Sequence, residues 1–170
     1  MAYVVIGGTF NCLHPGHREI LRRAFSLGGR VLVCLTSDAM ARKKHLPEKI
    51  APYGERKRAL LEFLSSSGFL ERAEIAKITD PFTEGLRPSL THIVVSEETK
   101  KNAGMLNVMR TDEGLPPLQV VVVPWVMAQD GRPVSGVRIR KGEIGRDGSS
   151  LCSRQARKES TGDRSDISPA

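Results

Sequence analysis

Apolar residues gather in five short runs along the chain, separated by stretches of mixed or helical pattern. The runs occupy residues 3–6, 30–36, 73–78, 92–96 and 119–126, and they include VLVCLT, HIVVS and QVVVVPW. Apolar and polar residues do not alternate within these runs, which is typical of strands buried on both faces of a parallel sheet. The pattern therefore predicts five parallel strands.

The stretches between the runs carry apolar residues at helical spacing. Residues 18–27 place their apolar side chains on one face, and residues 53–64 do the same. A shorter helix is predicted over 106–113, because Gly114 and the pair Pro116-Pro117 would end it. Strand and helix in alternation predict an α/β fold, a Rossmann-like doubly wound parallel five-stranded sheet with helices on both faces.

Length and composition are those of a globular protein with one main domain. The chain has 170 residues, of which 39% are apolar and 26% charged. No apolar stretch approaches the ~18 residues of a membrane helix, and no secretory signal is visible. We therefore expect a cytoplasmic protein without a membrane partner. The three cysteines are far apart, which argues against a disulfide framework or a zinc cluster.

A change in composition separates a domain over 1–148 from a tail over 149–170. The tail is rich in Ser, Arg and Asp and lacks apolar periodicity, so we expect it to be disordered. Residues 145–170 hold five basic and four acidic side chains, so the net charge of +7 belongs almost wholly to the domain. A basic domain attracts phosphorylated small molecules or nucleic acid. Because aromatic residues make up only 5%, a stacking platform for nucleic acid is not expected.

The stretch GGTFNCLHPGH at residues 7–17 joins the first strand to the first helix. Gly7 and Gly8 allow a sharp turn and a close approach to a ligand at the carboxyl end of the strand. His14 and His17 would then point toward one phosphate at the helix N-terminus. Neither a dinucleotide fingerprint nor a P-loop is present, and a zinc site would lack a third ligand. We therefore expect phosphate recognition and no protein-bound metal.

These residues resemble the signature of the nucleotidyltransferase superfamily, G-G-T-F-D-x-x-H-x-G-H. Four later stretches resemble the archaeal-type phosphopantetheine adenylyltransferases, a family similar to the adenylyltransferase half of eukaryotic CoA synthase. They are LTSDAMARKKH (35–45), PYGERKRALLEFL (52–64), VVSEETKKNAGMLNVMR (94–110) and VSGVRIRKGEI (134–144). The resemblance extends from about Tyr3 to about Gly148, and the later stretches decide the subfamily.

The resemblance implies transfer of the adenylyl group of ATP to 4′-phosphopantetheine, giving dephospho-CoA and pyrophosphate in coenzyme A biosynthesis. Mg²⁺ would accompany the ATP phosphates, and dephospho-CoA or CoA would bind as a product-like ligand. Two alternatives remain open. One is a related transferase with FMN, nicotinamide mononucleotide or glycerol phosphate as acceptor, and the other is a nucleotide-binding protein with weak or no turnover. The sequence does not predict the oligomeric state.

The resemblance also assigns roles to single residues. His17 would contact the α-phosphate and His14 the other ATP phosphates, while Thr9 and the backbone around Gly8 and Phe10 would hold the attacking phosphate. Lys43 would neutralise the phosphate of the acceptor, although Lys44 could take its place. The remaining nucleotide-side residues implied by the family are Ser96, Glu97, Thr99, Asn107, Arg110, Ser135, Arg138 and Arg140.

The chain departs from the family pattern at two places. Asn11 stands where the superfamily motif has Asp, which keeps hydrogen bonding but removes a charge. The family stretch I-S-S-T-R-I is replaced by VSGVRI, so that Gly136 and Val137 offer no hydroxyl to a phosphate. We expect a weakened enzyme rather than an inactive one. Arg56 and Arg58 are interpreted as charges on a helix surface, with contact between Arg56 and the site as the alternative for that residue.

Overall fold

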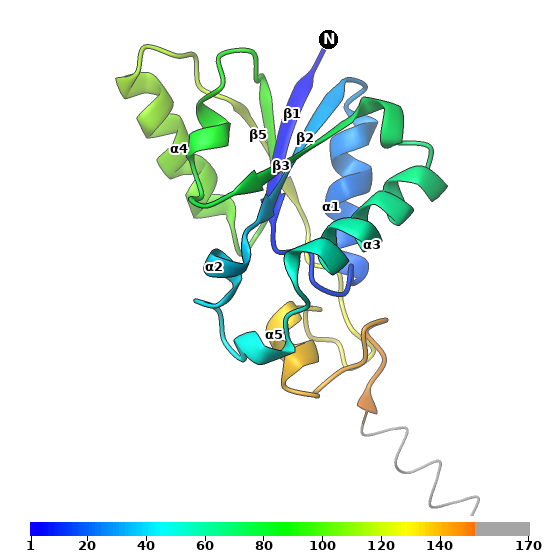
Figure 1. Ribbon diagram of the computed structural model, residues 1–170. Coiled ribbons are helices and arrows are strands. Elements are labelled where there is room, and N and C mark those ends of the chain that lie inside the picture. The colour runs from blue at the N-terminus through cyan, green and yellow to red at the C-terminus, as the bar shows by residue number, and fades with distance from the viewer. Residues whose placement is uncertain (152–170) are drawn as a thin grey trace, which may run out of the picture.

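Five parallel strands form one sheet in the order β3-β2-β1-β4-β5. The computed structural model describes residues 1–151 (Figure 1), and the predicted tail from residue 152 onward lies outside the described part. The strands are β1 (Tyr3–Gly8), β2 (Arg30–Thr36), β3 (Ala73–Ile78), β4 (His92–Ser96) and β5 (Gln119–Val123). All four neighbouring pairings are parallel, so every strand ends at the same edge of the sheet. The predicted sheet is confirmed.

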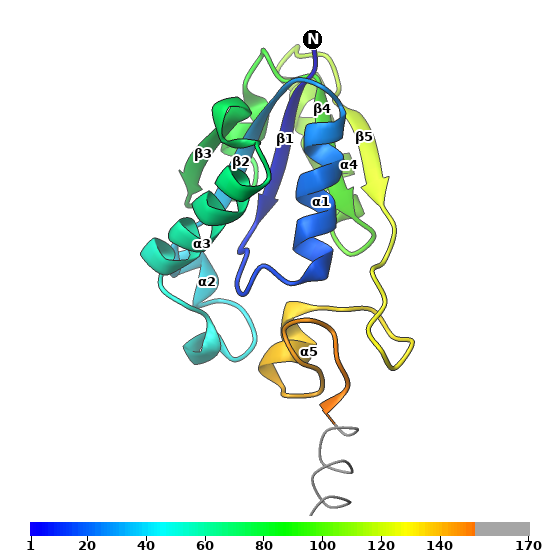
Figure 2. The ribbon, with the colours of Figure 1, turned by 90° about the vertical axis from the view of Figure 1, so that its right-hand side faces the viewer.

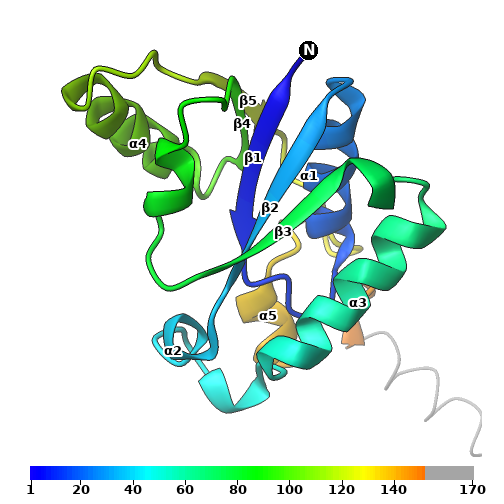
Figure 3. The same ribbon diagram turned by 45° about the horizontal axis from the view of Figure 1, so that its top comes forward.

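Helices cover both faces of the sheet, as Figures 2 and 3 show from two further directions. They are α1 (Pro15–Ser26), α2 (Asp38–Ala41), α3 (Tyr53–Ser66), α4 (Lys100–Asp112) and α5 (Gly136–Arg140), with short 3-10 turns at Pro47–Lys49, Leu70–Arg72 and Thr83–Leu86. Within the described residues, no helix is long and apolar enough to cross a membrane.

Two core clusters follow from the alternation of side chains along each buried strand. Val4 and Ile6 of β1 pack with α1 and α3, whereas Val5 faces the opposite side, where Leu106 of α4 lies. Both faces of the central strands are thus buried, which explains why the sequence shows continuous apolar runs.

Most element boundaries differ from the sequence prediction by a few residues, and three differences are larger or of another kind. Helix α4 begins at Lys100, six residues before the predicted start; of residues 100–105 only Ala103 is buried, which is too little for an apolar pattern to show in the sequence. Strand β5 ends at Val123, since Pro124 has no N–H for a further ladder bond. The one-turn helix α2 was not predicted, because it is too short to carry apolar periodicity.

A third, smaller cluster lies beyond the sheet. It consists of Ala128, Val134 and Ile144, with Ile139 of α5 packed against it. This C-terminal cluster follows β5 and holds α5 near the carboxyl ends of the strands (Figure 1). It shares no residue with the two sheet cores.

Candidate active site

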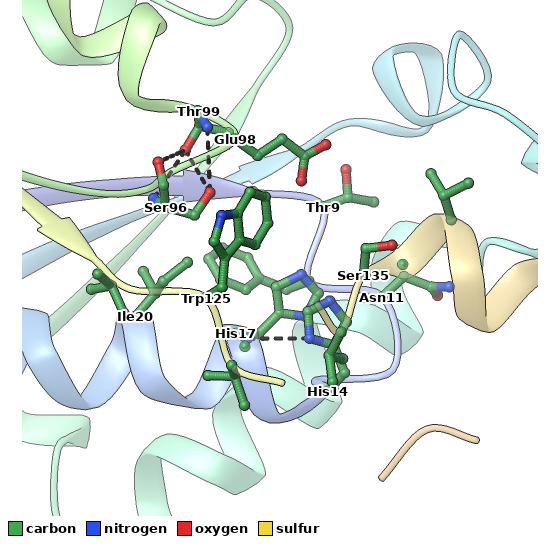
Figure 4. Close-up of a pocket in the computed structure, with 18 of the residues that line it drawn as sticks. Thr9, Asn11, His14, His17, Ile20, Ser96, Glu98, Thr99, Trp125 and Ser135 are labelled. Atoms are coloured by element: carbon green, nitrogen blue, oxygen red, sulfur yellow. Dashed lines mark hydrogen bonds between the residues drawn. The ribbon is translucent and has the colours of Figure 1, made fainter. Parts of the chain in front are cut away.

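A pocket lies at the carboxyl ends of β1, β4 and β5, where α1 and α5 begin (Figure 4). In open α/β sheets, ligands bind at this edge. The residues predicted from the sequence that line it are Gly7, Gly8, Thr9, Phe10, His14, His17, Ser96, Thr99, Ser135 and Arg140. Segments that lie more than 120 residues apart in the sequence therefore line the same pocket.

The turn between β1 and α1 is held in an unusual backbone conformation. Phe10, Cys12 and Leu13 have φ angles of 48°, 66° and 41°, in the left-handed region that residues with a Cβ rarely adopt. Each such residue costs on the order of 1 kcal/mol and persists only when its surroundings enforce it. Burial of the Phe10 and Leu13 side chains in the core with α1 supplies that enforcement.

The spacing of the two histidines is explained by the start of helix α1. His14 is the N-cap, and its Nδ1 accepts a hydrogen bond from the backbone N–H of His17 at 3.3 Å. Pro15 occupies the first helical position, where its missing N–H is not needed. A Cβ at Gly16 would lie 3.0 Å from Cε1 of His14. Glycine at this position therefore lets the imidazole cap the helix.

The imidazoles of His14 and His17 stack, with ring centroids 3.6 Å apart and an interplanar angle of 18°. Burial, with a smaller contribution from the charge of Arg140, lowers the pKa of His14 to about 4. The pKa of His17 is also well below its usual value. Burial is the main cause, and the charges of His14 and Lys44 contribute less. Both rings are thus neutral near pH 7. Nδ1 of His17 is buried and has no hydrogen-bond partner among the described residues, which is rare for a buried polar atom.

These low pKa values predict that the protein loses stability in mild acid. The unfolded chain binds a proton at His14 below a pKa of about 6.5, whereas the folded chain does so only near pH 4. The stability contribution is therefore complete above pH 6.5 and is lost as the pH falls toward 4, by about 3 kcal/mol for His14 alone. Melting temperatures between pH 4 and 7 should fall more steeply for the wild type than for His14→Asn, which keeps a good N-cap. Parallel curves for the two proteins would contradict the prediction.

Two cationic side chains line the pocket, Lys44 and Arg140. Nε of Arg140 donates a hydrogen bond to the carbonyl oxygen of His45 at 2.9 Å, and Nζ of Lys49 donates one to the carbonyl oxygen of Arg140 at 2.8 Å. The segment 45–49 and α5 are thereby joined across the pocket. Lys43 does not line it, and its neighbour Lys44 takes the predicted place.

Helix α5 supplies fewer side chains to the pocket wall than the family pattern suggests. Oγ of Ser135 caps it by accepting a hydrogen bond from the N–H of Arg138 at 3.3 Å. The guanidinium of Arg138 points elsewhere, because it pairs with Asp130 and with Glu143. Arg138 is absent from the pocket wall, and Arg140 alone supplies the predicted charge of this helix. At Gly136, a Cβ would lie 2.9 Å from Nη1 of Arg140, so the missing side chain leaves room for the guanidinium.

The loop after β4 reaches the pocket through Ser96, Glu98 and Thr99. The hydroxyls of Ser96 and Thr99 lie 3.1 Å apart, and the N–H of Ser96 donates to Oγ1 of Thr99 at 3.1 Å. Glu98, not the predicted Glu97, lines the cavity, and its carboxylate extends toward Thr9 in Figure 4. Which of two adjacent glutamates faces inward depends on the turn that these hydroxyls close.

Asn107 and Arg110 do not lie in the pocket wall. The amide of Asn107 exchanges two hydrogen bonds with the backbone of Leu118, at 2.9 and 2.7 Å. Arg110 is completely buried, and its guanidinium donates to carbonyl oxygens, among them those of Gly85 at 2.7 Å and Pro116 at 2.9 Å. Leu118 precedes β5, so these contacts lie at the other end of the strand from the pocket. Both side chains hold α4 to the sheet.

Arg56 is buried rather than on a helix surface, with 2% of its area exposed. Its Nη1 donates to the carbonyl oxygens of Thr9 at 3.0 Å and Thr36 at 2.9 Å, and its Nη2 pairs with Asp38 at 3.0 Å. The hydroxyl of Thr36 in turn donates to that of Thr9 at 3.1 Å. Arg56 therefore joins the ends of β1 and β2 and fixes Thr9 at the edge of the pocket.

Asn11 is explained by its two backbone partners. Its Oδ1 accepts a hydrogen bond from the N–H of Ala51 at 3.0 Å, and its Nδ2 donates one to the carbonyl oxygen of Lys49 at 3.3 Å. A carboxylate could make the first bond but would place a second acceptor against the Lys49 carbonyl. The amide is thus the side chain that satisfies both groups, and the lost charge of the motif has a structural reason.

Several lining residues were not predicted from the sequence. Besides Glu98, they include the apolar side chains of Ile20, Val123, Trp125 and Val126. The signal for Trp125 was its place near the end of the apolar run 119–126, directly after Pro124, where a strand of the sheet ends. Within the described residues, no group of three or more His, Cys, Asp or Glu side chains is placed to hold a metal ion.

Comparison with known proteins shows the family of the chain. The sequence model of the cytidylyltransferase-like family matches residues 5–142. A phosphopantetheine adenylyltransferase from Methanosarcina mazei is 40% identical over 151 residues, which cover 87% of this chain and 96% of the relative. One from Pyrococcus abyssi is 46% identical over 143 residues, or 83% of this chain and 90% of the relative.

Among solved structures, a protein of unknown function from Archaeoglobus fulgidus superimposes with a TM-score of 0.65 at 34% identity, over 72% of this chain and 89% of that one. A tyrosyl-tRNA synthetase from the same organism reaches a TM-score of 0.61 at 14% identity, over 82% of this chain and 59% of that one, which shows a shared fold alone. The match to the family model and to the curated relatives covers most of the chain. This chain therefore belongs to the cytidylyltransferase-like family and, within it, to the phosphopantetheine adenylyltransferases.

Proposed function

We propose that this protein transfers the adenylyl group of ATP to 4′-phosphopantetheine, releasing pyrophosphate and dephospho-CoA. An oxygen of the acceptor phosphate forms a bond to the α-phosphorus of ATP, and the bond from that phosphorus to the bridging oxygen of the β-phosphate breaks. Dephospho-CoA, or CoA, would occupy the same pocket as a product-like ligand. The two substrates favour a cytoplasmic location.

The protein's part in such a reaction is to position the two phosphates and stabilise the charge between them. His14 and His17 offer ring nitrogens at the start of α1, beside Thr9 at the end of β1. Lys44 and Arg140 supply positive charge on the pocket wall. Charge developing on the α-phosphate oxygens strengthens hydrogen bonds from these groups, and such preorganised contacts lower the barrier.

Mg²⁺ would be carried by the phosphates of ATP. The pocket fits this arrangement, because Glu98 is the one acidic side chain on its described wall and no protein cage for a metal surrounds it. A bound Mg²⁺ would neutralise part of the phosphate charge there. All other contacts in the proposal come from side chains of this protein.

One observation carries the proposal: the histidine pair is stacked and neutral, and the buried Nδ1 of His17 has no partner among residues 1–151. A structural pair would have satisfied that nitrogen internally. The nearby charges of Lys44 and Arg140, which already act on the two rings, are suited to a polyphosphate.

Pyrophosphate release from ATP tests the proposal. We expect release when 4′-phosphopantetheine is supplied and little release with FMN, nicotinamide mononucleotide or glycerol phosphate at the same concentration. Preference for one of those acceptors would replace the proposed substrate. Tight ATP binding without release for any acceptor would favour a nucleotide-binding protein that lacks turnover, the alternative that Gly136 and Val137 support.

A further inference from the structure

The single tryptophan of the chain stands in the pocket with much of its ring uncovered. Trp125 follows Pro124 at the end of β5 and is 39% exposed. Figure 4 shows its indole projecting into the cavity near His17. Large aromatic rings contribute to stability by being buried, so an indole left open inside a concave site is suited to covering a ligand.

The surroundings of Trp125 are apolar. Ile20, Val123 and Val126 line the same wall, and the indole has no ring, cation or hydrogen-bond contact in the part of the chain that the structure describes. Ile20 lies three residues after His17 on α1, which places both on one face of the helix. The wall therefore changes from phosphate-binding to apolar within one helical turn.

Position in the sheet separates this apolar wall from the acceptor side. The strand order puts β5 at one edge, with β4 between it and β1. Thr9 directly follows β1, and Lys44 follows α2 after β2, so both lie on the other side of β4 from β5. The histidines stand at the start of α1, between the two regions. A group bound at the α-phosphate position could thus extend toward Trp125 on one side and toward Lys44 on the other.

We infer that the adenine base of ATP stacks on the indole of Trp125, an assignment that rests on the proposed function of the pocket. A flat base gains from a flat aromatic surface, whereas a flexible aliphatic arm gains equally from any apolar side chain. The base would extend past Ile20 from phosphates held at His14 and His17. Trp125 is then a determinant of nucleotide affinity and takes no part in the chemical step.

Fluorescence of the lone tryptophan tests the inference on the intact protein without turnover. ATP is expected to change the emission of Trp125, whereas inorganic tripolyphosphate should compete with ATP yet leave the emission nearly unchanged. 4′-Phosphopantetheine alone should also leave it unchanged. A response to the acceptor and not to ATP would overturn the inference and place the indole over the pantetheine arm.

Substitutions provide the second measurement. Trp125→Ala is expected to raise KM for ATP about ten-fold, with KM for the acceptor and kcat changed less than about two-fold. Trp125→Phe should recover most of the affinity, and Trp125→Leu should not, because leucine is apolar but has no flat face. Met127→Ala is the matched control, since Met127 is 54% exposed but lies outside the pocket wall. Equal behaviour of the Phe and Leu variants would overturn the stacking.

The two measurements distinguish failure of this inference from failure of the proposed function. Pyrophosphate release with an ATP affinity that is unchanged in Trp125→Ala overturns the stacking and leaves the reaction in place. Emission that responds to ATP, in a protein that releases no pyrophosphate with any acceptor, supports the stacking and overturns the reaction.

Discussion

Replacing His17 by alanine is expected to lower kcat for pyrophosphate release by about 10²–10³-fold, the effect of removing one preorganised donor from a developing charge. The imidazole lies in the pocket and stacks on His14, and its Nδ1 has no partner among the described residues. Removing it therefore breaks no internal side-chain hydrogen bond. The loss should appear in kcat more than in KM for either substrate, because the contact is strongest when charge accumulates in the transition state.

Two further variants make this result specific. His17→Asn places an amide nitrogen near the position of Nδ1 and should recover part of the rate. His92→Ala is the matched control, because His92 begins β4 at the opposite end of the strand from the pocket. Steady-state kinetics on all three, with melting temperatures to confirm folding, provide the measurement. A loss of less than about five-fold in His17→Ala would remove the histidine from the proposed mechanism.

Replacing Arg56 by alanine is expected to destabilise the fold by about 3 kcal/mol, because polar partners in the interior lose a charged donor. The carbonyl oxygens of Thr9, Thr36 and Ala51 and the carboxylate of Asp38 all accept from this guanidinium. For a chain of this size the melting temperature should fall by roughly 6–12 °C. Activity should fall below the level explained by unfolding, since Thr9 loses the contact that fixes it.

Arg58 provides the control for this prediction. It lies two residues away on α3 and is exposed, so Arg58→Ala should melt within about 1–2 °C of the wild type. Arg56→Lys keeps the charge but cannot reach partners in several directions, and its melting temperature should lie between the two. If Arg56→Ala melts like Arg58→Ala, the buried network does not hold the ends of β1 and β2.

The sheet could be predicted from the sequence because its strands are buried on both faces. Such strands leave contiguous apolar runs, as at residues 31–35, and the turn motif after the first run marks where the pocket lies. Helix α4 was predicted too short, because Met105, Val108 and Met109 are exposed and Ala103 is the one buried residue before Leu106. Apolar periodicity reflects burial, so it does not reveal helical turns that bury a single small side chain.

The site was predicted less completely, for two physical reasons. A guanidinium on a helix has the same local pattern whether it is solvated or buried, and distant carbonyls decided the burial of Arg56 and Arg110. Adjacent residues of one kind, Lys43 with Lys44 and Glu97 with Glu98, differ only in which way a short turn directs them. The spacing of residues along the chain therefore predicts neither the burial of an arginine nor which of two adjacent like residues faces the pocket.

The small C-terminal cluster of Ala128, Val134 and Ile144 holds one wall of the pocket without belonging to either sheet core. Regions with little buried apolar area open at a lower free energy than the rest of a domain. Heating is therefore expected to separate α5, with Arg140, from the histidines while the strands are still paired. The working temperature range of this protein is then set by its last described segment, and a thermostabilising design should begin there rather than in the sheet.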